Sequence, residues 1–137
     1  MPVLDLPKTR AALTRGFQSS SFCTPEFNSF YWMFRAEFSN WLKRHGCSLV
    51  KTRRGHFEVS GFFMAPTGEP NGFRMFYFNT SDVRGMCQSL GMYYRTAKDL
   101  TDYTGGENRI VKLMGEFPPT MSFGPDRTGH PSNLKVS

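Results

Sequence analysis

The chain of 137 residues lacks the sequence features of membrane-spanning, secreted and disulfide-stabilised proteins. It has no run of about 18 apolar residues, which is the minimum for a transmembrane helix. Its first residues, from Met1 to Lys8, have neither the basic start nor the long apolar stretch of a signal peptide. The three cysteines, Cys23, Cys47 and Cys87, are an odd number and form no C-x-x-C pair. We therefore expect a cytoplasmic protein with reduced cysteines and no membrane partner.

Signatures of catalysis and of bound cofactors are also missing. His45, His56 and His130 form no H-x-x-x-H pair and no cluster with cysteine that would ligate a metal. There is no G-x-S-x-G nucleophile motif, no G-x-x-x-x-G-K-S/T phosphate loop and no G-x-G-x-x-G fingerprint. We therefore expect a binding protein without metal, cofactor or turnover. A metal-dependent nuclease is the less favoured alternative, since its candidate acids have no recognised spacing: Glu58, Asp82, Asp99, Asp102 and Glu107.

Aromatic and basic residues, by contrast, are plentiful. The 14 Phe, 5 Tyr and 2 Trp supply enough bulky apolar surface to bury the core of a single folded domain. The 17 Lys and Arg residues outnumber the 11 Asp and Glu residues, which leaves a net charge of +6. This balance favours a partner that carries phosphate.

A long amphipathic helix is predicted from about Pro25 to His45. Thr24 is an N-cap residue placed before a proline in the first turn. Two basic residues and His45 precede Gly46, as is common where a helix ends. Between these signals the large apolar residues fall within one stripe at 100° per residue: Phe27, Phe30, Tyr31, Phe34, Phe38, Trp41 and Leu42.

Beyond Gly46 the apolar period changes to two, which predicts strands. We expect strands over 47–52, 56–64, 73–79 and 91–98. The third of these is aromatic on both faces, which is typical of a central strand. Several short features complete this reading: a tight turn at Arg53-Arg54-Gly55, a short turn over 83–90, and a segment at 110–114 that fits a last strand or a helical turn.

These elements predict an α+β domain over residues 23–115, in which one long helix packs on an antiparallel sheet of about four strands. The helix stripe is expected to contact Phe57, Phe63, Met75 and Tyr77 or their neighbours on the opposite face. Residues 1–22 form an irregular arm that packs only partly, with two helical turns possible over 9–17. Residues 116–137 form an irregular or mobile tail.

Basic residues gather at the end of the predicted helix and around the first predicted hairpin: Lys43, Arg44, Lys51, Arg53 and Arg54. We expect the fold to bring them together into a surface that contacts phosphates. The alternative is that the two helical cations stabilise the helix dipole while the two arginines solvate a turn.

Trp32 lies about 130° from the centre of the apolar stripe, among polar residues of the predicted helix. Three interpretations are open: Trp32 anchors a protein interface, stacks on nucleic-acid bases as Tyr93 also would, or is covered by the N-terminal arm.

The segment 94–108 is the densest polar feature of the chain. Loops that follow strands commonly hold ligands, and here two cations supply charge while adjacent glycines let backbone N–H groups approach an anion. The candidate ligand-loop residues are Arg95, Lys98, Asp102, Tyr103, Gly105, Gly106 and Asn108. The alternative is a structural hairpin, in which Asp102 and Asn108 stabilise the turn and Arg95 pairs with Asp82.

Part of this segment resembles small uncharacterised bacteriophage proteins that carry an R-T-A-K…D-Y-T-G-G-x-N box. The residues that carry the resemblance are Ser81-Asp82-Val83-Arg84, Arg95-Thr96-Ala97-Lys98, Asp102-Tyr103-Thr104-Gly105-Gly106 and Asn108, about a fifth of the chain. The resemblance implies a viral origin and a role in the host cytoplasm as a host-takeover or anti-defence factor. It implies no particular reaction.

The sequence thus predicts a small basic protein that binds nucleic acid, a nucleotide or another phosphate-bearing ligand. The alternative is a protein–protein inhibitor or a phage assembly component that docks on a host or phage protein. DNA, RNA, a nucleotide and a protein all stay open as the partner, and so does the oligomeric state.

Overall fold

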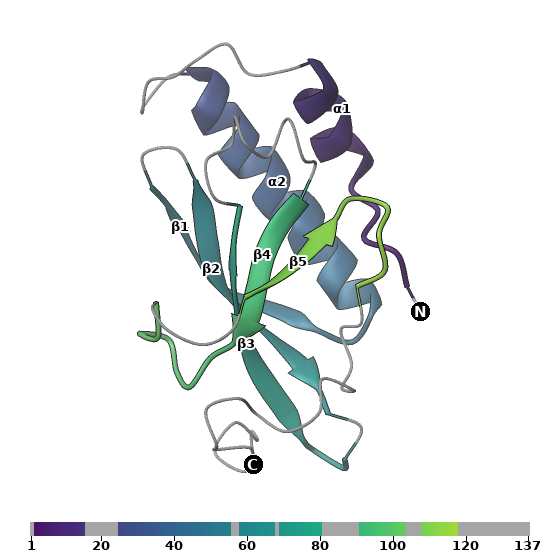
Figure 1. Ribbon diagram of the computed structural model, residues 1–137, viewed down its shortest axis with the longest axis vertical. Coiled ribbons are helices and arrows are strands. Elements are labelled where there is room, and N and C mark those ends of the chain that lie inside the picture. The colour runs from purple at the N-terminus through teal and green to yellow at the C-terminus, as the bar shows by residue number, and fades with distance from the viewer. Residues whose placement is uncertain are drawn as a thin grey trace.

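A computed structural model describes residues 2–15, 25–55, 58–67, 69–80, 91–103 and 108–117. In these residues two helices accompany one antiparallel sheet with the strand order β1-β2-β3-β4-β5 (Figure 1). The elements are α1 (Pro7–Arg15), α2 (Pro25–Arg44), β1 (Ser48–Arg54), β2 (Val59–Pro66), β3 (Phe73–Asn79), β4 (Gly91–Thr96) and β5 (Arg109–Lys112). The predicted α+β class is confirmed, with a second helix and a fifth strand beyond those predicted.

The differences from the predicted strands lie at their ends. β3 has the predicted bounds and is central, as its aromatic residues on both faces indicated. Arg53 and Arg54 belong to β1 rather than to a turn, because both still pair with β2. The segment at 110–114 contributes a strand, β5, and not a helical turn. Some predicted features lie outside the described residues: the strand start at 56–57, the turn at 83–90 and the glycine pair Gly105-Gly106.

The core lies between α2 and the face of the sheet that packs against it, here called the inner face. The ring centroids of Phe34 and Phe38 lie 6.2 and 5.1 Å from that of Phe78 on β3, and Phe38 also contacts Phe63 at 5.9 Å. Phe63 therefore packs as predicted. Met75 and Tyr77 are on the opposite face, because successive residues of a strand alternate between faces. The predicted helix stripe is buried at every position: Phe27, Phe30, Tyr31, Phe34, Phe38, Trp41 and Leu42.

The described part of the N-terminal segment belongs to this core, which corrects the expectation of an arm that packs only partly. Leu4, Leu6 and Leu13 are each at most 1% exposed. The Trp41 indole N–H donates a hydrogen bond of 2.9 Å to the Val3 carbonyl. Burial of three leucines against α2 fixes the segment far more firmly than its serine-rich continuation suggests.

The start of the predicted C-terminal tail is also fixed to the core. Glu116 forms a β-bridge with Val3, and the Phe117 amide donates to the Pro2 carbonyl at 2.9 Å. The Phe117 ring is fully buried, and its centroid lies 5.6 Å from that of Trp41. Residues 2–4 and 114–117 therefore close the domain together.

Glu37 of α2 caps the N-terminus of α1. Its carboxylate accepts hydrogen bonds from the amides of Lys8 and Thr9, both at 2.8 Å, and from the Thr9 hydroxyl at 2.7 Å. Leu6, which precedes the helix, has no side-chain acceptor, so a residue from a second helix supplies the cap. A carboxylate at this position also interacts favourably with the helix dipole.

We predict that Phe38→Ala lowers the free energy of unfolding by about 3–5 kcal/mol, because it leaves a cavity between α2 and β3. Urea denaturation followed by circular dichroism measures this loss. Trp32→Ala on the exposed side of the same helix is the matched control and should cost less than about 1 kcal/mol. An unchanged midpoint for Phe38→Ala would contradict the packing described here.

Candidate functional site

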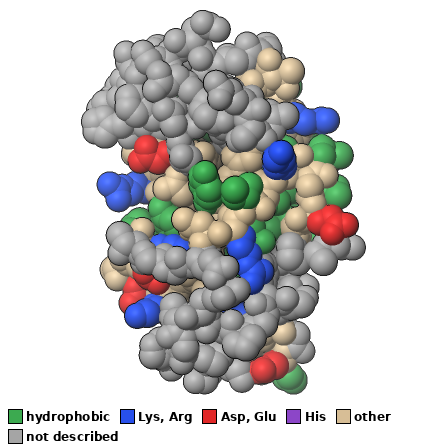
Figure 2. All heavy atoms as spheres, viewed as in Figure 1, with side chains coloured by type: hydrophobic (Ala, Val, Ile, Leu, Met, Phe, Trp, Pro, Cys, Tyr) green, Lys and Arg blue, Asp and Glu red, His purple; other side chains and the backbone are tan. Residues whose placement is uncertain are grey.

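The face of the sheet opposite α2, here called the outer face, carries two rows of side chains that run across the strands. Directly paired residues of an antiparallel sheet point to the same side, so strand pairing defines each row. The first row is Arg53, Ser60, Asn79, Tyr93 and Ile110. The second row is Lys51, Phe62, Tyr77 and Arg95. Figure 2 views this side of the molecule and shows Lys and Arg side chains around a hydrophobic patch.

Tyr103, from the loop after β4, covers the second row. Its ring centroid lies 5.2 Å from that of Phe62 and 6.0 Å from that of Tyr77, both in edge-to-face geometry. The Lys51 ammonium and the Arg53 guanidinium lie 5.7 and 5.5 Å from the centroid of the same ring. Both distances are within the range of cation–π attraction. Tyr103 therefore joins the basic hairpin and the 94–108 segment into one site, although sequence analysis treated them separately.

Arg95 holds this loop in place. Its side chain is 3% exposed, and its guanidinium lies 4.4 Å from the centroid of the Tyr77 ring. It donates hydrogen bonds to the carbonyls of Thr96, at 3.1 Å, and Asp102, at 2.6 Å, and forms an ion pair of 3.5 Å with the Asp102 carboxylate. The observed ionic partner is therefore Asp102, whereas Asp82 lies outside the described residues. Arg95 is built into the scaffold and does not face solvent as a ligand-binding cation.

The acids of the loop bind the loop's own backbone. The Asp102 carboxylate accepts from the Lys98 amide at 3.0 Å, which confirms the predicted side-chain to backbone bond of a structural turn. The Asp99 carboxylate accepts from the Thr101 hydroxyl at 2.6 Å and from its amide at 2.8 Å. These two hydrogen bonds, the hydroxyl first, lower the pKa of Asp99. Among the candidates of this segment that the structure describes, Lys98 and Asn108 are exposed.

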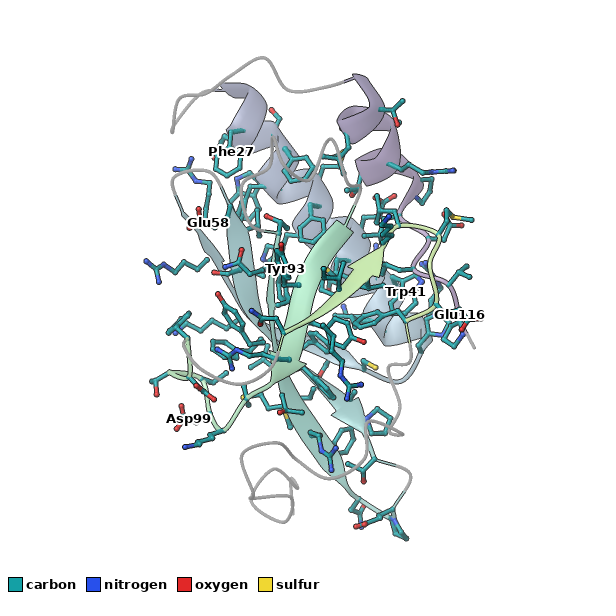
Figure 3. The ribbon with its side chains drawn as sticks, in the orientation of Figure 1. Phe27, Trp41, Glu58, Tyr93, Asp99 and Glu116 are labelled. Atoms are coloured by element: carbon teal, nitrogen blue, oxygen red, sulfur yellow. The ribbon has the colours of Figure 1, made fainter. Side chains whose placement is uncertain are left out.

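The predicted basic group is divided by the fold. Arg54 points to the inner face, where its guanidinium lies 5.8 Å from the ring centroid of Phe27 near the start of α2. Lys43 and Arg44 are at the other end of that helix, about 25 Å away at 1.5 Å per residue. Figure 3 shows the length of α2 between Phe27 and Trp41. The expectation of one basic cluster is therefore wrong. β1 runs back along α2, which carries Arg53 and Arg54 away from Lys43 and Arg44. On the outer face lie only two residues of the predicted group, Lys51 and Arg53.

Trp32 is exposed on α2, away from the outer face. Its side chain is 56% exposed, so the interpretation that the N-terminal arm covers it does not hold. The ring contacts Tyr31 edge-on at 5.0 Å, and the Arg35 guanidinium lies 5.8 Å from its centroid. Trp32 thus forms a second exposed aromatic position with a neighbouring cation.

No sequence motif singles out the residues that form the floor of the outer face: Ser60, Phe62, Tyr77 and Asn79. Phe62 and Tyr77 each adjoin a phenylalanine that points to the inner face, so alternation alone does not separate the two faces. Ile110 and Lys112 of β5 were missed because that segment was open between strand and helix. The available sequence signal was the set of aromatic residues at 62, 77 and 103. A sheet with aromatic side chains on both faces needs a second segment, besides the helix, to bury the outer-face rings.

The described residues contain no group of three or more His, Cys, Asp or Glu side chains that would hold a metal ion. Cys47 is buried, and burial raises the pKa of its thiol to about 12, so the thiolate needed for nucleophilic chemistry is not formed near neutral pH.

Among the residues that the structure describes, no helix has both the length and the apolar character to cross a membrane. Comparisons with protein-family models, curated proteins and solved structures gave no match. The resemblance to bacteriophage proteins stays a prediction.

We predict that Arg95→Ala lowers the free energy of unfolding by about 3 kcal/mol, near the lower end for a broken buried ion pair because Asp102 keeps part of its hydration. Chemical denaturation measures the change. Lys98→Ala removes an exposed cation from the same loop and should alter stability by less than about 0.5 kcal/mol. Wild-type stability in Arg95→Ala would show that the loop does not depend on this residue.

Proposed function

We propose that the protein binds nucleic acid through the outer face of its sheet. The observation that carries the proposal is the position of Lys51 and Arg53 beside the Tyr103 ring, on the same face of the sheet as the exposed ring of Tyr93 on β4. Cations that lie among aromatic rings on one surface can contact phosphates and bases together. A bacteriophage protein of this kind would act in the host cytoplasm as a host-takeover or anti-defence factor, which is the role that the sequence resemblance implies.

The charges on this face support an anionic ligand. Lys51, Arg53 and Lys112 are exposed there, and Lys112 shares the side of Tyr93 because its pairing partner is Gly91. The two described acids of the adjacent loop are committed to local hydrogen bonds and to Arg95. The local field therefore attracts phosphate, in keeping with the net charge of +6.

We predict that the protein binds fluorescently labelled DNA or RNA with an affinity that falls steeply with salt, because neutralised phosphates release counterions. Fluorescence anisotropy at two salt concentrations gives the slope. Lys51→Gln combined with Arg53→Gln should lower the magnitude of this slope by about 2, one for each lost phosphate contact.

The matched control is Lys43→Gln combined with Arg44→Gln, which removes the same charge at the far end of α2. This control should leave the slope nearly unchanged. Equal effects of both double variants would indicate attraction by net charge alone, and the absence of binding at low salt would contradict nucleic-acid binding. Melting temperatures of both variants check that the Tyr103 loop stays in place.

A protein interface is the second candidate function, and the exposure of Trp32 favours it. Tryptophan and arginine are the residues most enriched at binding hot spots, and Arg35 lies beside the Trp32 ring. This candidate corresponds to the inhibitor or assembly component that the sequence left open.

For this candidate we predict that a nuclease-treated lysate of host cells yields one stoichiometric partner on the immobilised protein. Trp32→Ala should abolish its recovery, because truncation removes the anchor. The Lys51→Gln and Arg53→Gln double variant should retain the partner. If the Trp32→Ala variant recovers the partner as well as the wild-type protein does, the surface around Trp32 is not the binding site.

A further inference from the structure

The two rows of the outer face differ in how far they are open. In the second row Phe62 is fully buried and Tyr77 is 9% exposed, since Tyr103 covers them. In the first row Tyr93 is 39% exposed and Ile110, its direct pairing partner, is 63% exposed. Figure 3 shows Tyr93 on β4 near the middle of this side of the sheet. The first row thus presents an aromatic ring and an aliphatic side chain next to each other.

The chemistry of the first row changes along its length. Arg53 is at the β1 end, Ser60 in the middle is buried, the Asn79 amide beside it donates to the Tyr77 hydroxyl at 2.8 Å, and Tyr93 follows on β4. Neighbouring strands are about 4.8 Å apart, so the backbones at Arg53 and Tyr93 are separated by about 14 Å. An arginine side chain at one end and a ring at the other can therefore contact a phosphate and a base of the same short segment.

The width of the sheet argues against a duplex as the preferred ligand. Five strands span about 19 Å, whereas the major groove of B-DNA is about 12 Å wide and admits a helix or a two-stranded ribbon. The face can therefore not enter the groove to read base edges. A base inside a duplex also has both ring faces covered by its neighbours, while an unpaired base offers a ring face to an aromatic side chain.

We infer that the ligand is single-stranded nucleic acid that crosses the strands along the first row. One base stacks on Tyr93 beside Ile110, and the phosphates toward β1 contact Arg53 and Lys51. This inference rests on the proposed function and adds the class of nucleic acid and the residue that holds a base. It also assigns different roles to the two ends of the row: Lys51 and Arg53 on β1 bind phosphates, and Tyr93 on β4 stacks on a base.

The test compares an oligothymidylate of about 12 nucleotides, its duplex with oligoadenylate, and inorganic polyphosphate as a competitor that lacks bases. The single strand should bind at least about tenfold more tightly than the duplex, and polyphosphate should compete poorly at equal phosphate concentration. Tyr93→Ala should weaken single-strand binding by about 10- to 100-fold, whereas Tyr93→Phe, which keeps the ring, should stay within about threefold of wild type. Trp32→Ala is the control for loss of an exposed aromatic residue elsewhere.

A Tyr93→Trp variant provides a readout that does not depend on truncation. Its additional fluorescence, measured against the wild-type protein, should be quenched by the single strand and not by polyphosphate. Equal affinity for strand and duplex, or an unquenched tryptophan at saturation, would overturn the inference and leave nucleic-acid binding itself standing. Absence of binding by every nucleic acid at low salt would overturn both.

Discussion

β2 and β3 carry aromatic side chains on both faces, and this constrains the rest of the structure. Phe63 and Phe78 require a cover on the inner face, which α2 provides. Phe62 and Tyr77 require a second cover on the outer face, which the loop after β4 provides through Tyr103. Leaving either pair exposed would forfeit about 1.5–3 kcal/mol for each large ring. A two-layer domain thereby acquires a partial third layer that is only one loop thick.

The position of the loop after β4 over buried aromatic rings explains why this polar loop is held by several hydrogen bonds and an ion pair. A loop over an apolar cluster must satisfy its own backbone groups away from water. Arg95 does this for two carbonyls, and Asp102 does it for the amide of Lys98. Polar residues that resemble a ligand-binding set in the sequence are therefore largely structural. The exposed cations Lys51 and Arg53, which lie beside the Tyr103 ring, come from β1 at the edge of the sheet.

The elements with strong local signals could be predicted from the sequence. The sequence of the helix over 25–44 has a capping residue type before it, a first-turn proline and an unbroken apolar stripe, and β3 has aromatic residues on both faces. The site could not be predicted in the same way, because it depends on register. The placement of Lys51 and Arg53 on the outer face and of Arg54 on the inner face follows from pairing with β2. The separation of Lys43 from Arg53 follows from the direction in which β1 leaves the helix, and no local pattern states that direction.

The cap that Glu37 provides to α1 has a consequence for the order of folding. A helix of 9 residues is marginal in water by itself, and the acceptor for its first amides lies 28 to 29 residues further along the chain. The partners of Leu4 are still further along the chain: its amide donates to the Gly115 carbonyl, and its carbonyl accepts from the Met114 amide. During synthesis on the ribosome, Leu4, Lys8 and Thr9 thus emerge well before the residues that supply their hydrogen-bond partners. A nascent chain stopped before residue 114 has α2 to cover its three N-terminal leucines but lacks Phe117 and the backbone partners of Leu4, so the core is sealed only once residues 114–117 have been added.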